Sequence, residues 1–483
     1  MTVSGTGGTQ TVNSTNVAIT KSFAGAFGDS IGNLTFTTST LGGLKEVAAS
    51  STATLTTVTV NGPVALAGVV TASLTTNPAS VNGTVDVGVS HPNGAASATW
   101  KGASTAVGIK VHGGQSSLTA GNAAADSLIV TGPVSVSAYR NATLTESKGT
   151  MTTTGVTLSS TTGTGTVTVS GTSLTVNGPI SVSSFQAANV TANGGTATTA
   201  NGFTVISKAR SATITAGGNA FTVNGDATVT GYLNATINET AGTITTNNVK
   251  RGAGDTASVT PAGTSFTANG GFQVTGKLAT NVTFGTSSTS ELKGKIAITG
   301  GALGDTFTAS SKFKADQSMS LKFGNGDNSV TIGDKSGAAG VVGDLSIATG
   351  IGADTITIRQ TSVGDKVSIL TSSGIDGLTI DDGAVFTGKF TTDLGSSDDT
   401  ITVAQDTAAQ GSPGPVLFNG LTNLLGNTGN DTLFLGKATG APGADSKSAV
   451  QFAASSIVDG GLGLNVFDPT TAQTSGQTIK HWP

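Results

Sequence analysis

A short phrase of alternating residues around a glycine recurs five times, and its spacing constrains the fold more than any other feature of the chain. The phrase is TVNGP or a close variant, centred on Gly62, Gly132, Gly178, Gly225 and Gly270. Successive glycines lie 70, 46, 47 and 45 residues apart, all close to multiples of about 23. A unit of that length is too short to enclose its own core and buries apolar side chains only by stacking on copies of itself. The spacing therefore predicts a solenoid with one coil for each such unit.

The phrase itself has the pattern of a strand, a corner and a second strand. Leu174 and Val176 alternate with Thr175 before the corner, and Ile180 and Val182 continue the alternation after it. Asn-Gly between alternating strands is also a strong hairpin signal. Hairpins alone do not explain the repeat interval, so we expect an all-β parallel β-helix or β-solenoid with coils of about 23 residues. Several β-sandwich domains are the alternative.

Composition supports strands over helices. The 483 residues include 70 glycines, and charged residues make up 10% of the chain. Glycine and β-branched or hydroxyl residues lose free energy in a helix interior. The nearest approach to a helical pattern is residues 41–53, which we expect to be a cap or a loop. We divide the chain into an N-terminal cap or assembly segment (1–50), a Thr/Val/Gly-rich solenoid (51–300) and an Asp-rich solenoid (301–483).

Charge and hydropathy exclude several classes of protein. A net charge of -4 with 23 lysines and arginines gives no basic surface for nucleic acid. No apolar stretch approaches the length of a membrane span. The absence of cysteine fits a protein outside the cell that needs no redox management. The first ten residues lack a basic head and an apolar segment, so we expect a cleaved signal peptide or another export route.

Aspartate is concentrated in the last part of the chain. Of 23 aspartates, 18 lie between Asp305 and Asp468, while the chain has only four glutamates. The shorter acid suits turns, where its carboxylate binds nearby backbone groups or a cation. Several turns share a Gly-rich segment, an Asp or Asn, and an alternating strand, as at residues 350–358, 426–433 and 460–467, with looser versions at 300–307, 324–327 and 395–401.

These turns resemble the RTX nonapeptide G-G-x-G-x-D-x-U-x, in which turn carbonyls and the aspartate bind Ca²⁺ between stacked coils. Calcium accepts several hard oxygen ligands in flexible geometry. The resemblance implies Ca²⁺ as cofactor and a set of metal ligands comprising Asp305, Asp327, Asp354, Asp376, Asp399 and Asp431. RTX arrays repeat every nine residues, whereas these positions lie 22, 27, 22, 23 and 32 apart, which matches one coil. The alternative to calcium binding is that the aspartates only accept hydrogen bonds from backbone N–H groups of their turns.

The whole chain is similar to the large Thr/Gly/Val-rich surface proteins of bacteria, which include β-strand-repeat adhesins, S-layer proteins and fibre-forming solenoids. The resemblance implies a secreted bacterial protein, extracellular or on the cell surface, that acts as a scaffold or adhesin and uses calcium for assembly. Copies of itself are the partners we expect, together with cell-surface polysaccharide; nucleic acid and a membrane span are not expected.

An enzyme is not expected, although β-helices also house polysaccharide-degrading enzymes. Aromatic platforms for sugars are scarce, since the chain has two tryptophans and two tyrosines. We interpret Tyr139 and Arg140 as surface residues without a catalytic role. The three histidines do not have the spacing of metal ligands. Neighbouring acids such as Asp398 and Asp399, or Asp381 and Asp382, point to opposite faces of a strand. Ice binding is not favoured, because the Thr-x-Thr motifs form no continuous ladder.

The sequence thus predicts a secreted structural protein that self-assembles into an extracellular fibre or S-layer-type lattice. A cell-surface adhesin with a solenoid stalk and a polysaccharide-degrading β-helix enzyme are the alternatives. The open edges of a solenoid invite strand addition. Residues 2–20 alternate weakly, and we expect this segment to pair with a neighbouring molecule.

Overall fold

The computed structural model describes residues 9–11, 15–22, 31–37, 40–285, 288–310, 312–334, 338–381, 383–404, 415–436, 450–453, 456–468, 472–473 and 478–481. The chain forms two compact units, Met1–Thr246 and Asn247–Pro483. Each is an all-β parallel β-solenoid with coils of about 23 residues, and the described ranges contain strands but no helix. The predicted solenoid is therefore confirmed, and the alternatives of β-sandwich domains and hairpins at the Asn-Gly corners are wrong.

The first unit begins with five strands, which include the two longest of the described residues, β4 and β5. Strand β1 (Thr9–Thr11) pairs with β3 (Ile31–Thr37), and β2 (Thr15–Ser22) pairs with β4 (Thr40–Val60). Strand β4 also pairs with β3 and with β5 (Val64–Val89), again in parallel. Residues 41–53 lie in β4 and bury alternate side chains, so the expectation of a cap or loop was wrong. The described parts of residues 2–20 already pair with strands of their own chain.

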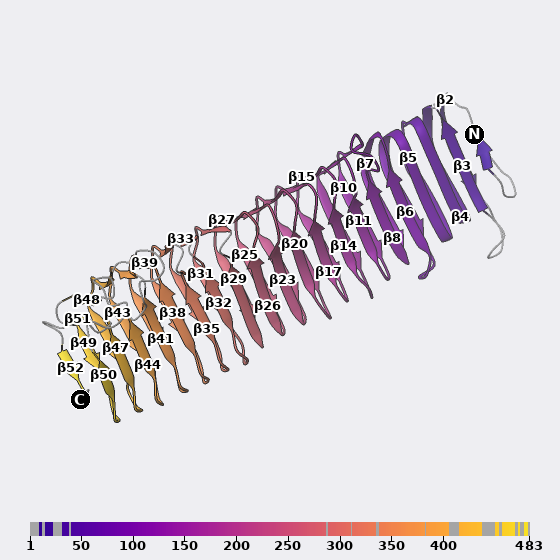
Figure 1. The fold of residues 1–483 in the computed structure, drawn as a ribbon. Helices are drawn as coiled ribbons and strands as arrows, with labels where there is room; N and C mark the ends of the chain where they lie inside the picture. The colour runs from indigo at the N-terminus through magenta and orange to yellow at the C-terminus, as the bar shows by residue number, and fades with distance from the viewer. Residues whose placement is uncertain are drawn as a thin grey trace. The chain divides into compact units, whose positions relative to one another are not determined.

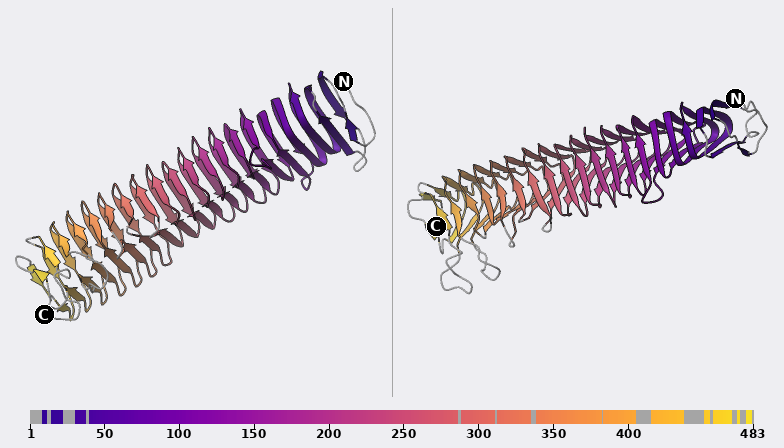
Figure 2. Two further views of the ribbon diagram at one scale, coloured as in Figure 1. Left: turned by 45° about the horizontal axis from the view of Figure 1, so that its top comes forward. Right: turned by 90° about the horizontal axis from the view of Figure 1, so that it is seen from above.

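Three parallel ladders follow in the first unit, and Figures 1 and 2 show their strands stacked side by side. The first ladder contains β7 (Ala103–Gly113), β10 (Pro133–Ala138), β13 (Gly155–Ser160), β16 (Ile180–Ser184), β19 (Phe203–Ser207) and β22 (Ala227–Gly231). The second contains β6 (Ala95–Trp100), β8 (Gln115–Ala120), β11 (Ala142–Glu146), β14 (Gly165–Val169), β17 (Ala188–Ala192), β20 (Ala212–Ala216) and β23 (Asn234–Glu239). The third contains β9 (Ser127–Val130), β12 (Thr150–Thr153), β15 (Ser173–Val176), β18 (Thr196–Thr199), β21 (Ala220–Val223) and β24 (Thr243–Thr246).

The second unit also has three parallel ladders (Figure 1). The first contains β25 (Val249–Ala253), β28 (Phe272–Gly276), β31 (Ile296–Thr299), β34 (Met319–Lys322), β37 (Leu345–Ala348), β40 (Val367–Leu370), β43 (Phe390–Asp393), β46 (Thr422–Leu425), β49 (Ile457–Asp459) and β52 (Thr478–Lys480). The second contains β26 (Thr256–Pro261), β29 (Ala279–Phe284), β32 (Thr306–Ala309), β35 (Ser329–Ile332), β38 (Thr355–Arg359), β41 (Gly377–Asp381), β44 (Thr400–Val403), β47 (Thr432–Leu435) and β50 (Val466–Asp468). The third contains β27 (Ser265–Ala268), β30 (Thr289–Leu292), β33 (Phe313–Ala315), β36 (Ala339–Val341), β39 (Thr361–Val363), β42 (Val385–Phe386), β45 (Val416–Phe418), β48 (Val450–Phe452) and β51 (Ala472–Gln473).

Alternation within each strand builds the core. Strands such as β14 and β16 bury every second side chain, because successive residues of a strand face opposite sides of the sheet. In the second unit the core includes phenylalanines stacked from coil to coil: the ring centroids of Phe386 and Phe418 lie 5.2 Å apart, and those of Phe418 and Phe452 lie 5.0 Å apart. Aromatic pairs at such distances add stability beyond their burial.

The repeated glycine phrase marks a corner where two coils approach closely. A Cβ atom on Gly178 would collide with the carbonyl oxygen of Thr154 in the preceding coil. Buried threonine hydroxyls close the same corner from the following coil: Thr153 donates to the carbonyl of Gly132 at 2.9 Å, and Thr199 donates to that of Gly178 at 2.7 Å. Thr246 donates to the carbonyl of Gly225 at 3.3 Å, so between Gly132 and Gly225 this arrangement recurs in every second coil, at intervals of 46 and 47 residues.

The boundary between the units lies at Thr246, whereas the composition changes near residue 300, inside the second unit. The three-part division at residues 50 and 300 describes composition and stays a prediction about function. The Asp-rich region is thus carried by the later coils of one solenoid unit.

Candidate functional site

The Gly-rich turns of the second unit stack on one another at the corner between its first and second ladders. Each turn connects a strand of the first ladder to the next strand of the second, as residues 371–376 connect β40 to β41. Single bridges join the central residues of successive turns: Ile351 to Ser373, Ser373 to Ser396, Ser396 to Thr428, and Thr428 to Leu462. Positive φ angles at Gly352, Gly374 and Gly429 explain the glycines at the next position. The turns are therefore in register from coil to coil.

One Asp or Asn from each turn points inward and forms a continuous column, which we call the Asx column. Its members are Asp305, Asn328, Asp354, Asp376, Asp399, Asp431 and Asn465, all at most 5% exposed. The Oδ1 atom of each later member accepts a hydrogen bond from the backbone N–H of the member before it. The N···O distances along the column are 2.9, 2.9, 2.8, 2.8, 3.0 and 2.8 Å. Side chains thus replace the backbone carbonyls of an ordinary ladder.

Both described ends of the column have further partners. At one end, Asp305 accepts hydrogen bonds from the N–H groups of Thr280 at 2.6 Å, Gly301 at 3.2 Å and Gly324 at 3.4 Å. At the other end, the Nδ2 of Asn465 donates to the carbonyl of His481 at 3.0 Å. The backbone N–H groups of the column members from Asp305 to Asp431 are therefore satisfied.

The aspartates and asparagines of the column differ in the second polar atom of the side chain, which is Oδ2 in aspartate and Nδ2 in asparagine. The Nδ2 of Asn328 donates to the turn carbonyls of Gly324 and Gly326 at 3.0 and 2.9 Å. In Asp354, Asp399 and Asp431 the Oδ2 atom is buried and has no hydrogen-bond partner. An ionised carboxylate at this place would face carbonyl oxygens with no hydrogen between them, which is costly in a buried site. A proton or a cation beside Oδ2 would remove this cost.

Burial raises the pKa values of four carboxyls in the Asx column. The pKa of Asp399 is raised to about 7 by burial, against the hydrogen bond from Asp376 and with the help of the nearby charges of Asp376, Asp431 and Asp398. Burial likewise raises the pKa values of Asp305, Asp376 and Asp431. Removing water from around a carboxylate disfavours its charged form.

Five of the six aspartates predicted as metal ligands are brought together in the Asx column, and Asp327 is not among them. Asp327 lies one residue before the column member Asn328, and its Oδ1 accepts the N–H of Ala353 at 2.9 Å on the exposed side of the turn. The sequence contained a signal for the correct register: Asn328 stands two residues before the buried Val330, as Asp354 stands two before the buried Ile356. Asn465 likewise stands two residues before an apolar residue, the partly buried Phe467.

The donor set of the column suits calcium in chemistry, because carboxylate and turn carbonyl oxygens are hard ligands. The Oδ1 atoms are already engaged, so an ion would have to use the Oδ2 atoms and the adjacent carbonyls. Among the described residues, no three His, Cys, Asp or Glu side chains come close enough to hold a metal ion by themselves. Calcium therefore stays a prediction, and its fit depends on the unpartnered Oδ2 atoms.

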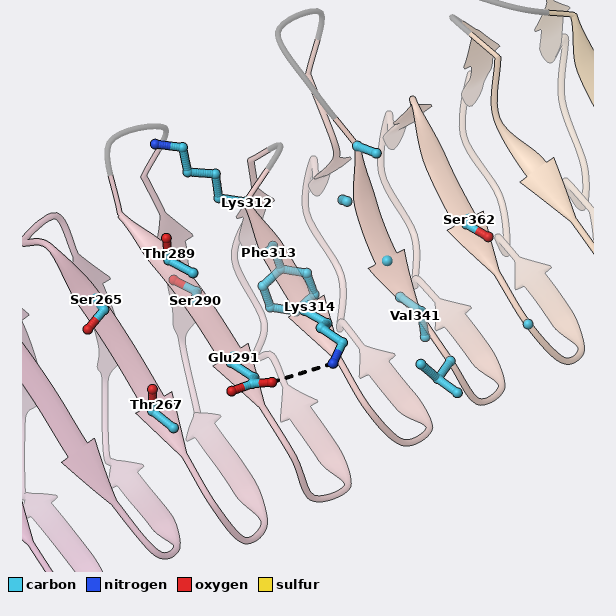
Figure 3. A pocket seen from close by; sticks show the side chains of 15 residues that line it. Ser265, Thr267, Thr289, Ser290, Glu291, Lys312, Phe313, Lys314, Val341 and Ser362 are labelled. Carbon is cyan, nitrogen blue, oxygen red and sulfur yellow. Dashed lines mark hydrogen bonds and ion pairs between the residues drawn. The ribbon is translucent and has the colours of Figure 1, made fainter.

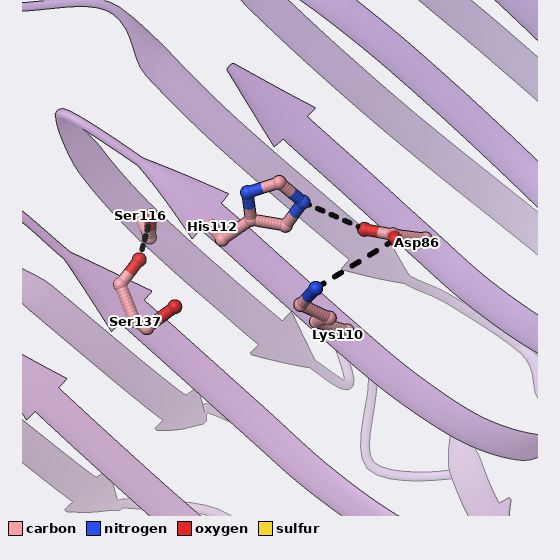
Figure 4. A network of polar contacts seen from close by, with 5 residues as sticks. All are labelled: Asp86, Lys110, His112, Ser116 and Ser137. Carbon is pink, nitrogen blue, oxygen red and sulfur yellow. Dashed lines mark hydrogen bonds and ion pairs between the residues drawn. The ribbon is translucent and has the colours of Figure 1, made fainter. Parts of the chain in front are cut away.

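Two other polar groups lie on the outer surface. Figure 3 shows an open groove in the second unit where Lys314 pairs with Glu291 at 3.4 Å. In the first unit the Nε2 of His112 lies 2.9 Å from the Oδ1 of Asp86, and the Ser116 hydroxyl donates to the backbone carbonyl of Ser137 at 2.7 Å (Figure 4). Neither arrangement joins a nucleophile to a base, because the serine hydroxyl is directed to backbone and not to the histidine.

The remaining sequence candidates lie apart from the column. Asp398 is exposed while Asp399 is buried, as expected for neighbours that face opposite sides. Tyr139 and Arg140 lie at an exposed corner of the first unit. Asp382 and Trp482 lie outside the described residues.

The chain matches no protein-family model, no curated protein and no solved structure at a significant level. Within the part of the chain that the structure describes, no helix has the length and apolar character needed to cross a membrane. The solenoid fold and the Asx column are therefore inferred from the residues of this chain alone.

Proposed function

We propose that the protein is an extracellular structural protein whose solenoids assemble end to end with copies of themselves. In each unit, parallel backbone ladders run from coil to coil, so every coil is a template for the next. A second molecule can extend such a ladder by strand addition, with backbone hydrogen bonds supplying affinity and register.

The observation that carries the proposal is the exposed core of the last described coil. Ile479 in β52 pairs with Val458 in β49, and the two lie in one core column. Val458 is 1% exposed, whereas Ile479 is 41% exposed. Leu464, in the adjoining turn, is 85% exposed. No described strand pairs with the other side of β50 or β52.

A coil of the second molecule would bury apolar surface at this edge in addition to forming backbone hydrogen bonds. Covering apolar surface contributes roughly 25 cal/mol per Å², and a coil with alternating Val, Ile and Leu matches the pattern of every ladder below it. The proposed partner surface is the outer edge of β1 and β2 in a second copy, since these strands pair with their own chain through β3 and β4.

Electron microscopy and light scattering of the purified protein test the proposal, and filaments are expected. Ile479→Lys places a charge on the open edge and should prevent filaments while the circular dichroism spectrum and the melting curve stay unchanged. Leu370→Lys is the matched control, because Leu370 is 43% exposed on the outer face of β40. It should leave filaments intact.

A monomer that persists at high concentration overturns the assembly proposal and favours an adhesin with a solenoid stalk. Loss of filaments in Leu370→Lys but not in Ile479→Lys also overturns it, since the contact would then be lateral.

A further inference from the structure

One corner of the first unit carries an exposed aromatic residue in every second coil. Tyr139, Phe185 and Tyr232 follow directly after β10, β16 and β22, and they are 49%, 47% and 63% exposed. The strand ends before them, Ala138, Ser184 and Gly231, belong to one register column. The three aromatic residues therefore occupy the same place in coils that are two apart.

These aromatic residues stand out from the rest of the outer surface. Tyr139 and Tyr232 are the two tyrosines of the whole chain, and both lie in this one column. Outward positions of the neighbouring strands are mainly threonine and serine, as in β11 and β16. A rank of exposed rings on an otherwise hydroxyl-rich surface is the kind of apolar patch that marks an interaction site. We call residues 139–141, 161–163, 185–187, 208–210 and 232–234 the aromatic corner.

Backbone hydrogen bonds hold successive turns of the aromatic corner together. The N–H of Thr162 donates to the carbonyl of Tyr139 at 2.8 Å, and the N–H of Ala209 donates to that of Phe185 at 2.7 Å. Buried hydroxyls add to this support: Ser160 donates to the carbonyl of Arg140, and Ser207 donates to that of Gln186. The spacing of the rings is therefore set by the ladder and not by flexible loops, so little ordering is needed on binding.

The charge of the aromatic corner has one sign. Arg140, Lys208 and Arg210 lie on it and are exposed, and its residues include no aspartate or glutamate. The first unit as a whole has eight lysines and arginines, so three of them gather here. A negatively charged partner is complementary to this surface.

We propose that the aromatic corner binds an extended anionic polysaccharide built from uronic acids. Neighbouring strands of a sheet lie about 4.8 Å apart, so rings two coils apart are separated by roughly 9.6 Å. That separation is comparable to the length of one disaccharide in an extended chain. The apolar faces of alternate sugar rings stack on Tyr139, Phe185 and Tyr232, and the basic side chains pair with the carboxylates. The inference rests on the first unit alone and does not depend on end-to-end assembly.

Affinity electrophoresis and calorimetry with polymannuronate and hyaluronan test the proposal, with dextran as a neutral polymer. The full protein should bind the two anionic polymers and not dextran. Replacing all three aromatic residues, as Tyr139→Ala, Phe185→Ala and Tyr232→Ala together, should weaken binding at least about tenfold. Replacing Arg140, Lys208 and Arg210 by glutamine should weaken binding and reduce its dependence on salt, because fewer ion pairs form.

The matched control is Val107→Ala with Ile129→Ala, two exposed apolar residues of the same unit that are 42% and 46% exposed outside the aromatic corner. It should bind as the unaltered protein does. Circular dichroism and melting curves show that each variant is folded, which exposed positions should permit. Absence of binding to both anionic polymers at low salt overturns the proposal. Equal loss of binding in the control, or equal binding of dextran, overturns it as well.

Discussion

The Oδ1 atom of Asp399 accepts the backbone N–H of Asp376 at 2.8 Å, one coil away. This bond uses a buried carboxyl to do the work of a backbone carbonyl, and the same relationship links every pair of neighbours in the Asx column. Five of the aspartates of the second unit have this role, for which the side chain of aspartate is one methylene shorter than that of glutamate. The unpartnered Oδ2 of Asp399 is the chemical consequence, and it leads to three predictions.

Asp399→Asn should stabilise the protein at pH 8 in the presence of chelator. The amide Oδ1 keeps the bond from Asp376, and the amide N–H₂ supplies the donor that Asn328 supplies in its own turn. We expect a gain of about 1–2 kcal/mol in the free energy of unfolding, because a buried acceptor no longer lacks a donor. Denaturant unfolding measures this difference.

Asp398→Asn is the control for that substitution, because Asp398 is the exposed neighbour whose Oδ1 accepts the N–H of Asn430 at 2.8 Å. Its effect should stay within about 0.5 kcal/mol. A lower stability of Asp399→Asn at pH 8 in chelator would contradict a stabilising effect of a hydrogen at Oδ2.

Stability of the second unit should fall as the pH rises from about 4 to about 7 in the absence of metal. Burial raises the folded-state pKa of Asp399 to about 7, whereas an aspartate in an unfolded chain titrates near 4. Between these two pKa values the folded state holds a proton that the unfolded chain has released. Raising the pH through this range therefore lowers the free energy of unfolding. Hydrogen exchange of the peptides that contain Asp376, Asp399 and Asp431 should quicken over this range by more than the intrinsic, base-catalysed rise of amide exchange. The triple variant with asparagine at these positions should show a flatter profile, and an unaltered profile would rule out the column as the source.

Calcium should reverse that loss if the Oδ2 atoms bind it. Millimolar Ca²⁺ at pH 8 should raise the melting temperature and slow exchange in residues 350–431, because the ion replaces the missing proton between carboxylate and carbonyl oxygens. Mg²⁺ is the control, since it is smaller and dehydrates reluctantly. Asp399→Asn should reduce the calcium effect. Identical melting curves with calcium and with chelator would show that the column does not bind calcium.

The sequence predicts the coil length because the corners leave no room for a side chain. Gly178 is the example: a Cβ there would meet the carbonyl of Thr154, so the glycine recurs with the coil. In the alternate coils Gly155 and Gly202 lie one position later in the register, opposite Pro133 and Pro179, so a glycine in the register of Gly178 recurs only at multiples of the coil. The two-coil period of Tyr139, Phe185 and Tyr232 could have been found in the same way.

Register within a turn was harder to predict. Asp327 and Asn328 are adjacent and both can cap backbone donors, so residue type alone does not separate them. The inward position follows from the alternation of the next strand, which becomes reliable only when the coils are aligned. The unpartnered state of the Oδ2 atoms depends on three-dimensional burial and has no signal in the sequence.

Thr199→Val tests whether the alternate-coil threonines stabilise the first unit. The Thr199 hydroxyl donates to the carbonyl of Gly178 at 2.7 Å and lies 3.1 Å from that of Gly202, and it is 2% exposed. Valine has nearly the same shape and occupies the equivalent place in β15 and β21, at Val176 and Val223. Loss of the hydroxyl leaves the Gly178 carbonyl buried without this donor and should cost about 1–3 kcal/mol in the free energy of unfolding. Thr198→Val, on the outer face of the same strand, should change it by less than about 0.5 kcal/mol. Equal effects of the two substitutions would mean that the threonine is retained for its volume and not for its hydrogen bond.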